Sequence, residues 1–285
     1  MKIAVFGNNY QATHLNELRG FLSLLKIEGH EVRVEEDFAR YLIANGIPVK
    51  ENEIAKKIDP DTSLVASIGG DGTFLHAADW VGNAEIPIMG INTGHLGYLT
   101  GYSFSNLENI STALRGKFDV SSRMTLELTS PYLPADISPY ALNEIAISKG
   151  DTTSMVEIKA AINGKYLADY MADGLVISTP TGSTAYNLSC GGPILEPTLD
   201  SIVLSPIAPH SLTFRPLVID GKSMLEFEVR SRGAECHVGV DGRTFAVPAD
   251  GSVLKISKAS RRVNVVQPPG VDFASVLRSK LLWGG

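Results

Sequence analysis

The sequence is poor in cysteine, in positive charge and in long apolar runs. Its two cysteines, Cys190 and Cys236, argue against a secreted disulfide scaffold. The 25 basic and 31 acidic residues give a net charge of −6, which argues against a sequence-independent DNA-binding protein. No apolar run approaches the roughly 18 residues of a membrane span, and a strand-like segment, rather than a signal peptide, follows Met1. We therefore expect a cytoplasmic protein without a membrane or nucleic-acid partner.

Several common catalytic signatures are also missing. The sequence has no P-loop G-x-x-x-x-G-K-[ST], no dinucleotide-binding G-x-G-x-x-G after its first strand, and no G-x-S-x-G, H-E-x-x-H or paired C-x-x-C motif. Its six histidines show no metal-ligand spacing. These absences disfavour a P-loop NTPase, a nicotinamide-dependent oxidoreductase, a serine hydrolase and a structural zinc protein.

What is present indicates a folded chain of about two domains. The apolar share of 44% and the charged share of 20% are typical of globular proteins. At about 150 residues per domain, a length of 285 residues suggests two domains. The chain is long enough to form hydrophobic cores without disulfides or structural metals.

The first part alternates predicted strands and helices. An α/β domain with a parallel sheet is the fold that such alternation indicates. We expect a helix from residue 105 to about 114, because Ser105 and Glu108 have capping-box spacing. The other expected strands cover residues 2–6, 32–34, 64–68 and 86–91, and the other helices cover residues 15–25 and 73–80.

The pattern changes near residue 120. Short β-like runs then continue to residue 267, separated by hairpin cues. These cues are Asn163-Gly164, Asp220-Gly221, Asp241-Gly242 and Asp250-Gly251. We predict an α/β phosphate-binding domain over residues 1–120 and an all-β-rich domain over 121–267. After Pro268-Pro269-Gly270, the tail of residues 268–285 is expected to return to the first domain.

The first motif, Gly69-Gly70-Asp71-Gly72, joins a predicted buried strand to a helix. Glycines let the backbone approach a ligand closely, and the amides at a helix N-terminus form an anion site. Thr73 adds a hydroxyl suited to a phosphate. The motif is typical of a phosphate cradle that contains one carboxylate. The alternative is a tight turn in which Asp71 caps the helix.

The second motif runs from Asp173 to Pro193 and is rich in hydroxyl groups around Pro180. Ser183 or Thr184 could cap a short helix that extends to Ser189, and Tyr186 offers a flat face for stacking. Such a segment can present amides and hydroxyls to a phosphate, a sugar or a base. A Ser/Thr-rich surface loop is the alternative, but the apolar strand before it and the Gly-Gly-Pro after it argue against a free linker.

Together the two motifs resemble those of the NAD kinase family, which phosphorylates NAD to NADP. The segment Asn92-Thr93-Gly94-His95-Leu96-Gly97 and the pair Asn143-Glu144 also match family motifs in the right order, so the resemblance covers most of residues 60–267. The first motif is shared with lipid kinases and phosphofructokinases, whereas the second is far more specific. The resemblance implies an α/β domain followed by a β-rich domain, with transfer of the γ-phosphoryl group of ATP to the 2′-hydroxyl of the adenosine ribose of NAD.

The resemblance also implies roles for individual residues. Asp71 is implied to contact the 2′-hydroxyl and to be the proton acceptor. Phosphate binding is implied for Gly69, Gly70 and Thr73. The substrate-binding residues that it implies are Gly72, His76, Asn143, Glu144, Asp173, Thr184, Ala185, Tyr186, Ser189 and Ala208. It further implies Mg²⁺ or another divalent metal with ATP, and a homodimer or homotetramer. For His76, an ordinary half-exposed helix histidine is an equal alternative.

The sequence departs from the family at Met171, where many relatives carry a basic residue. Arg215 and Arg243 are candidates to neutralise phosphate, although surface or structural roles also suit them. Two other functions remain open. A lipid or sugar kinase would share only the first motif, and a lipid kinase would need an exposed apolar or basic membrane face. A non-catalytic NAD(P) sensor would be marked by loss of Asp71 or of the cradle glycines, and all of these are present.

Overall fold

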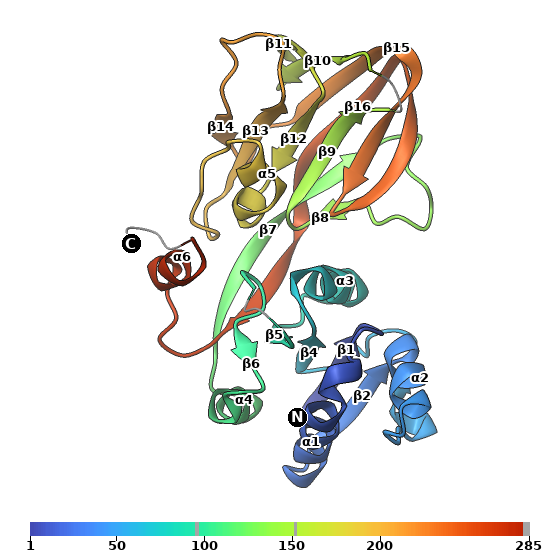
Figure 1. Ribbon diagram of the computed structural model, residues 1–285, viewed down its shortest axis with the longest axis vertical. Helices are drawn as coiled ribbons and strands as arrows, with labels where there is room; N and C mark the ends of the chain where they lie inside the picture. Colours follow the sequence, from blue (N-terminus) through green and yellow to red (C-terminus); the bar gives the residue numbers. More distant parts are fainter. Residues whose placement is uncertain (95–96, 151–152, 282–285) are drawn as a thin grey trace. The chain divides into compact units, whose positions relative to one another are not determined.

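The protein divides into two compact units, which are described separately (Figure 1). The structure is a computed structural model that describes residues 1–94, 97–150 and 153–281, apart from the side chains at 233 and 234. Unit 1 consists of Met1–Ser122 and Val263–Gly285, and unit 2 of Arg123–Arg262. His95 and Leu96 of the matched motif, and the last four residues of the predicted tail, lie outside the described residues.

Unit 1 is built on a parallel sheet, as the alternating pattern predicted. Its strand order is β3-β2-β1-β4-β5, and β6 and the last part of β16 also pair with β5 in parallel. β4 and β5 are buried at every residue, which explains their uninterrupted apolar sequences. The strands are β1 (Lys2–Gly7), β2 (Glu31–Glu35), β3 (Ile54–Ala55), β4 (Leu64–Ile68), β5 (Ile88–Asn92), β6 (Tyr102–Ser103) and β16 (Arg243–Gln267).

Helices α1, α3 and α4 lie where the sequence predicted helices, whereas α2 was not predicted. The α-helices are α1 (Leu15–Ile27), α2 (Glu36–Ala44), α3 (Asp71–Val81), α4 (Leu107–Leu114) and α6 (Phe273–Leu281). Short 3₁₀ turns are η1 (Ala12–His14), η2 (Glu51–Glu53) and η3 (Gly82–Ala84). Helix α6 places the segment after β16 in unit 1, so the described part of the tail returns to the first domain as expected.

The predicted cap of α4 is wrong by one residue. The N-cap is Asn106, whose Oδ1 accepts a hydrogen bond from the Asn109 amide at 3.2 Å. The Ser105 hydroxyl instead lies 2.9 Å from the Ser103 hydroxyl. Asn is as good an N-cap as Ser, and a serine with a local hydroxyl partner can leave the cap to its neighbour.

Unit 2 is built mainly on antiparallel strands. The order β14-β13-β12-β9-β15-β16 is antiparallel throughout, and the β10–β11 hairpin pairs with β15. β7 pairs with β16 and β8. The elements are β7 (Asp119–Thr129), β8 (Tyr140–Ala141), β9 (Glu144–Lys149), β10 (Val156–Ile162), β11 (Lys165–Ala172), β12 (Gly174–Ser178), η4 (Thr181–Thr184), α5 (Tyr186–Ser189), β13 (Ser201–Ile207), β14 (Leu217–Asp220) and β15 (Leu225–Val240).

Three of the four hairpin cues are turns, whereas Asp250-Gly251 lies inside β16 at a register shift in its pairing with β15, so that prediction is wrong. Asn163-Gly164 connects β10 to β11 and Asp241-Gly242 connects β15 to β16, and all four residues have positive φ.

Each unit also has its own hydrophobic core, formed around β1, β4 and β5 in unit 1 and around β9, β10 and β15 in unit 2. Among the described residues, we find no helix with the length and apolar character to cross a bilayer.

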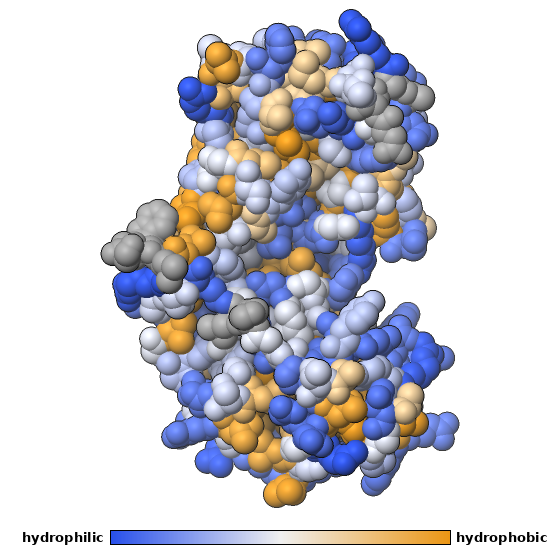
Figure 2. Space-filling model, viewed as in Figure 1, coloured by the Kyte–Doolittle hydropathy of each residue, from blue (hydrophilic) through white to orange (hydrophobic). Residues whose placement is uncertain are grey.

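Helix α1 exposes some of its apolar residues. Leu18, Leu22 and Leu25 are buried as the helical spacing predicted. Its neighbouring face forms an apolar groove with α4, lined in part by Ile27 and Leu107, and the lower part of Figure 2, where these helices lie, carries hydrophobic surface. The helix therefore has apolar residues beyond those that its core contacts need.

Replacing Gly20 by alanine is expected to stabilise unit 1. Gly20 lies inside α1, and a Cβ placed there would meet nothing within 4 Å. Alanine should therefore raise the free energy of unfolding by about 0.5–1 kcal/mol. The control is Gly29→Ala, just past the helix, where φ is +76° and alanine should cost about 1–2 kcal/mol. Thermal melting of both variants measures the difference, and equal shifts would contradict the prediction.

Candidate active site

The connection from β4 to α3 forms an open helix N-terminus. Gly69 has a φ of +147°, and a Cβ there would come within 2.4 Å of Thr73 Oγ1. Gly70 is the N-cap and provides no side chain to accept the first helical amides. The first N–H groups of a helix have no intrahelical partners, so this end of α3 presents donors and a positive partial charge. This geometry suits an anion, as the first motif predicted.

Asp71 is not the cap of α3 but its first residue. Its Oδ2 accepts a hydrogen bond from the Tyr98 amide at 2.7 Å. Its Oδ1 accepts bonds from the Leu99 amide at 3.1 Å, from the Thr100 amide at 3.2 Å and from Thr100 Oγ1 at 3.0 Å. The capping alternative is therefore wrong, and the carboxylate is oriented by residues 98–100 beside the helix N-terminus.

The other predicted residues of this motif differ in exposure. Thr73 is buried, and its Oγ1 accepts a hydrogen bond from Asn8 Nδ2 at 2.7 Å. Gly70, Gly72 and His76 are exposed, and the four-residue spacing of Gly72 and His76 places them on one face of α3. The exposed groups of the motif are thus mainly backbone amides, together with the imidazole of His76.

In unit 2, Asn143 and Glu144 lie at the start of β9, where Glu144 is opposite Ser178 of β12. Burial raises the pKa of the Glu144 carboxyl to about 8, and the negative charge of Asp241 acts in the same direction, against the backbone N–H of Tyr186. Among the described residues, no donor reaches Oε2 of Glu144, which is shielded from solvent. The neutral, protonated form of this side chain is therefore favoured.

Helix α5 begins without a side-chain cap, so the predicted caps Ser183 and Thr184 are wrong. Its N-cap is Ala185. Ser183 Oγ instead accepts a hydrogen bond from the Leu195 amide at 3.0 Å, and Thr184 Oγ1 donates to the Thr181 carbonyl at 3.5 Å. Both hydroxyls are held by the loop itself, because a hydroxyl folded into a turn satisfies nearby backbone groups first.

A buried asparagine holds the hydroxyl-rich segment in place. Asn187 Nδ2 donates to the carbonyls of Ser183 and Pro193 at 3.0 and 3.1 Å, and its Oδ1 accepts from Ser205 Oγ at 2.6 Å. Thr179 Oγ1 donates to the Leu142 carbonyl at 2.6 Å. The second motif is therefore an ordered part of unit 2, and the alternative of a free surface loop is excluded.

Asp173 and Ala208 lie at neighbouring strand ends. The Asp173 amide donates to the Ile207 carbonyl at 2.9 Å, and Ala208, which follows β13, has a φ of +42°. The Asp173 carboxylate pairs with Lys149 Nζ at 2.8 Å. Sequence reasoning missed Lys149. The only signal that could have found it is its position at the end of the strand that follows Asn143-Glu144.

Tyr186 links these groups. Its phenol pKa is raised by burial, then by Cys190, and further by the charges of Glu144 and Asp173, so each of these groups lies near the phenol. The structure therefore places Tyr186 near Glu144, which the sequence assigned to a separate motif, and near Asp173 of its own motif. The residue is 42% exposed, so it is open to a stacking partner. Ala185 is the N-cap of the same short helix and Ser189 is its last residue.

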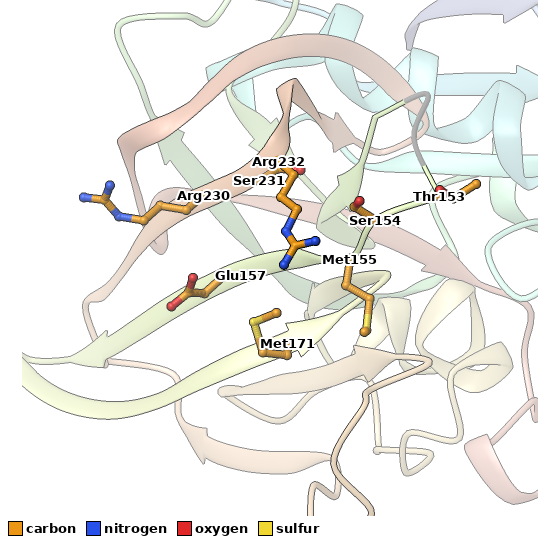
Figure 3. A pocket seen from close by; sticks show the side chains of 8 residues that line it. All are labelled: Thr153, Ser154, Met155, Glu157, Met171, Arg230, Ser231 and Arg232. Atoms are coloured by element: carbon orange, nitrogen blue, oxygen red, sulfur yellow. The ribbon is translucent and has the colours of Figure 1, made fainter.

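Met171 faces a cavity of about 540 Å³ in unit 2, which Figure 3 shows. Met171 is opposite Glu157 of β10, and Glu157 is opposite Arg230 of β15. In Figure 3 the Arg232 guanidinium extends toward Met155 and Met171, whereas Arg230 points away. A positive charge from β15 therefore lies beside the position where the family's basic residue is missing.

The other two candidate arginines differ. Arg215 donates from one nitrogen to the carbonyls of Leu212 and Phe214, both at 2.7 Å, so it holds its own loop. Arg243 begins β16 opposite Val240. Within the described residues, no group of three or more His, Cys, Asp and Glu side chains is arranged to hold a metal ion.

The comparisons with known proteins agree with both motifs. The family model for the ATP-NAD kinase N-terminal domain matches residues 16–117, and that for the ATP-NAD kinase C-terminal domain matches residues 142–268. An NAD kinase of Bacteroides fragilis is 43% identical over 286 residues, covering 100% of this chain and 98% of the relative. An NAD kinase of Christiangramia forsetii is 41% identical over 291 residues, with the same coverage.

Two solved structures are similar in fold. An NAD kinase from Archaeoglobus fulgidus in complex with ATP has a TM-score of 0.71 and 25% identity, covering 94% of each chain. Yeast NADH kinase complexed with NADH has a TM-score of 0.85 and 24% identity, covering 100% of this chain and 88% of that one, and supports the fold alone. With relatives above 40% identity along its whole length, the chain belongs to the ATP-NAD kinase family.

Proposed function

We propose that this protein transfers the γ-phosphoryl group of ATP to the 2′-hydroxyl of the adenosine ribose of NAD, giving NADP and ADP. The observation that carries the proposal is the Asp71 carboxylate, which is held in one orientation beside the amide-lined N-terminus of α3. Phosphoryl transfer depends mainly on positioning and charge neutralisation. An oriented acceptor next to an anion site supplies both.

The first motif acts on the phosphates and on the attacking hydroxyl. The amides around Gly69, Gly70 and Gly72 bind the phosphates of ATP, with Thr73 supporting the loop that presents them. Asp71 accepts a hydrogen bond from the 2′-hydroxyl of NAD. As the new bond forms between the 2′-oxygen and the γ-phosphorus, the bond from that phosphorus to the β–γ bridging oxygen breaks, and the hydroxyl proton passes to Asp71.

Unit 2 supplies most of the NAD contacts. An amide and a carboxyl side by side suit the paired hydroxyls of a ribose, so Asn143 and Glu144 bind the sugar. A protonated Glu144 donates one hydrogen bond and accepts another. Tyr186 stacks on a base or lies against a sugar. The remaining proposed NAD contacts are His76, Asp173, Thr184, Ala185, Ser189 and Ala208.

We assign phosphate binding and NAD binding to the two domains that the sequence predicts. Residues 1–120 with 268–285 form the phosphate-binding domain, and residues 121–267 form the NAD-binding domain. ATP enters as its complex with Mg²⁺ or another divalent cation, because such ions are bound largely through substrate phosphates. The protein acts in the cytoplasm.

Asp71→Asn is expected to fold but to lower the turnover of NAD to NADP by roughly 100-fold or more, because the acceptor loses its charge and its basicity. Purified protein is incubated with NAD, ATP and Mg²⁺, and NADP is read with an NADP-specific dehydrogenase. The control is Asp79→Asn on the same helix, which should keep its turnover. NADP formation near the wild-type rate in Asp71→Asn would overturn the assigned role.

The raised pKa of Glu144 predicts a pH-dependent stability difference. Its pKa rises from 4.5 to about 8 on folding, so the folded state binds this proton more tightly than the unfolded state. Stability is therefore lost as pH rises through this interval. Glu144→Gln mimics the neutral carboxyl, and its melting temperature should exceed that of the wild type by a few degrees more at pH 9 than at pH 6. Glu226→Gln, partly exposed on β15, is the control. A pH-independent difference would contradict the assignment.

We also expect a homodimer or homotetramer, because the family commonly assembles in this way. Light scattering at micromolar protein concentration measures the mass directly. A mass of two or four times the 30.6 kDa of one chain is expected. A monomer at that concentration would contradict this part of the proposal.

A further inference from the structure

The Asp241-Gly242 turn was predicted only as a hairpin, but its aspartate does more than turn the chain. Asp241 and Gly242 connect β15 to β16 with φ values of +46° and +83°. The ladder between β9 and β15 pairs Ile145 with Val240. Continuing this register by one residue places Asp241 against Glu144, and the Asp241 amide donates to the Glu144 carbonyl at 3.1 Å.

The Asp241 carboxylate binds three consecutive amides of the segment that leads into β9. Oδ2 accepts from the Leu142 amide at 2.6 Å, and Oδ1 accepts from the amides of Asn143 and Glu144 at 2.9 and 3.1 Å. Hydrogen bonds to an ionised acceptor are shorter and stronger than those between neutral groups. The backbone of both proposed ribose-binding residues is thus fixed by one side chain almost 100 positions away in the sequence.

The aspartates of the other Asp-Gly pairs show that this arrangement is not a general property of the pair. In the turn after β14, Asp220 Oδ1 accepts from the Lys222 amide at 2.7 Å, so it satisfies its own turn. At Asp250-Gly251, the Asp250 carboxylate lies near the Ser252 hydroxyl at 3.3 Å. Asp241 differs because its carboxylate oxygens accept hydrogen bonds from the segment that leads into another strand, β9.

The position of Asp241 also has an electrostatic consequence. Its carboxylate lies close enough to Glu144 to raise the pKa of that side chain, which burial already raises. Among the described residues, the titratable groups and donors that act on Glu144 besides Asp241 include the amide and phenol of Tyr186 and the thiol of Cys190. A neutral residue at position 241 could form the turn without placing a negative charge beside the Glu144 carboxyl.

We propose that Asp241 is a positioning residue for NAD, which holds the backbone of Asn143 and Glu144 in the geometry that binds the ribose. The inference rests on the proposed function of Asn143 and Glu144. Asp241 itself touches neither the substrate nor the transferred phosphoryl group.

The test compares Asp241→Asn with Asp220→Asn, which is the same substitution in a turn whose aspartate accepts a hydrogen bond from within that turn. Asp241→Asn should raise the KM for NAD by roughly tenfold, because charge-assisted bonds are lost, while kcat changes little. The alkaline inflection of kcat/KM for NAD should move to lower pH, because the like charge beside Glu144 is gone. Asp220→Asn should leave both quantities unchanged. A purely structural role would lower the melting temperature without moving the inflection.

A second variant covers the case in which Asp241→Asn does not fold. Asp241→Glu keeps the charge but displaces the carboxylate from the three amides. It should raise the KM for NAD while the inflection stays near its wild-type position. Asp241 variants with wild-type KM and inflection would overturn the inference, as would equal effects of Asp241→Asn and Asp220→Asn.

Glu144→Gln and Asn143→Ala, measured alongside, separate this inference from the proposed function. Glu144→Gln should abolish the inflection, and both should raise the KM for NAD. If neither variant changes the KM for NAD, the ribose assignment fails and the inference fails with it. If both raise it while the Asp241 variants do not, the ribose assignment stands and only the positioning role is overturned.

Discussion

One interaction occurs in each unit and fixes backbone beside the residues proposed to bind substrate: a single aspartate carboxylate accepts hydrogen bonds from three consecutive backbone amides. In unit 1, Asp71 binds residues 98–100, and in unit 2, Asp241 binds residues 142–144. Each hydrogen bond to a charged acceptor contributes about 1.5–3 kcal/mol. These bonds give irregular backbone a defined shape where no strand or helix ladder can do so. Segments that would otherwise vary become fixed parts of the fold.

The two aspartates use this interaction in different ways. Asp71 is both the anchor and the group proposed to meet the substrate hydroxyl, so its orientation and its chemistry are coupled. Asp241 anchors residues whose own side chains are proposed to meet the substrate. Unit 1 therefore combines positioning and reaction in one side chain, whereas unit 2 distributes them over a turn and a strand.

Much of the fold could be predicted from the sequence because its signals are local. The apolar run at β4 and the leucine spacing in α1 report burial directly, and the hairpin at Asp241-Gly242 needs positive φ at both positions. Helix caps were less predictable, because Ser105 and Ser183 found other partners within hydrogen-bond reach. The partners of Asp71 and Asp241 could not be predicted, since they lie 27–29 and 97–99 positions away and leave no periodic trace. Asn143 and Glu144 were found only through the family resemblance.

The two thiols of the chain differ in a way that experiments can use. Cys236 is fully buried, whereas Cys190 is partly exposed at the end of α5, next to Ser189 and close to Glu144. Burial raises the pKa of the Cys190 thiol, which lowers its thiolate fraction and therefore its rate of alkylation. The unmodified protein thus carries a built-in footprinting probe, whose alkylation rate reports when a bound molecule covers α5 without any engineered label.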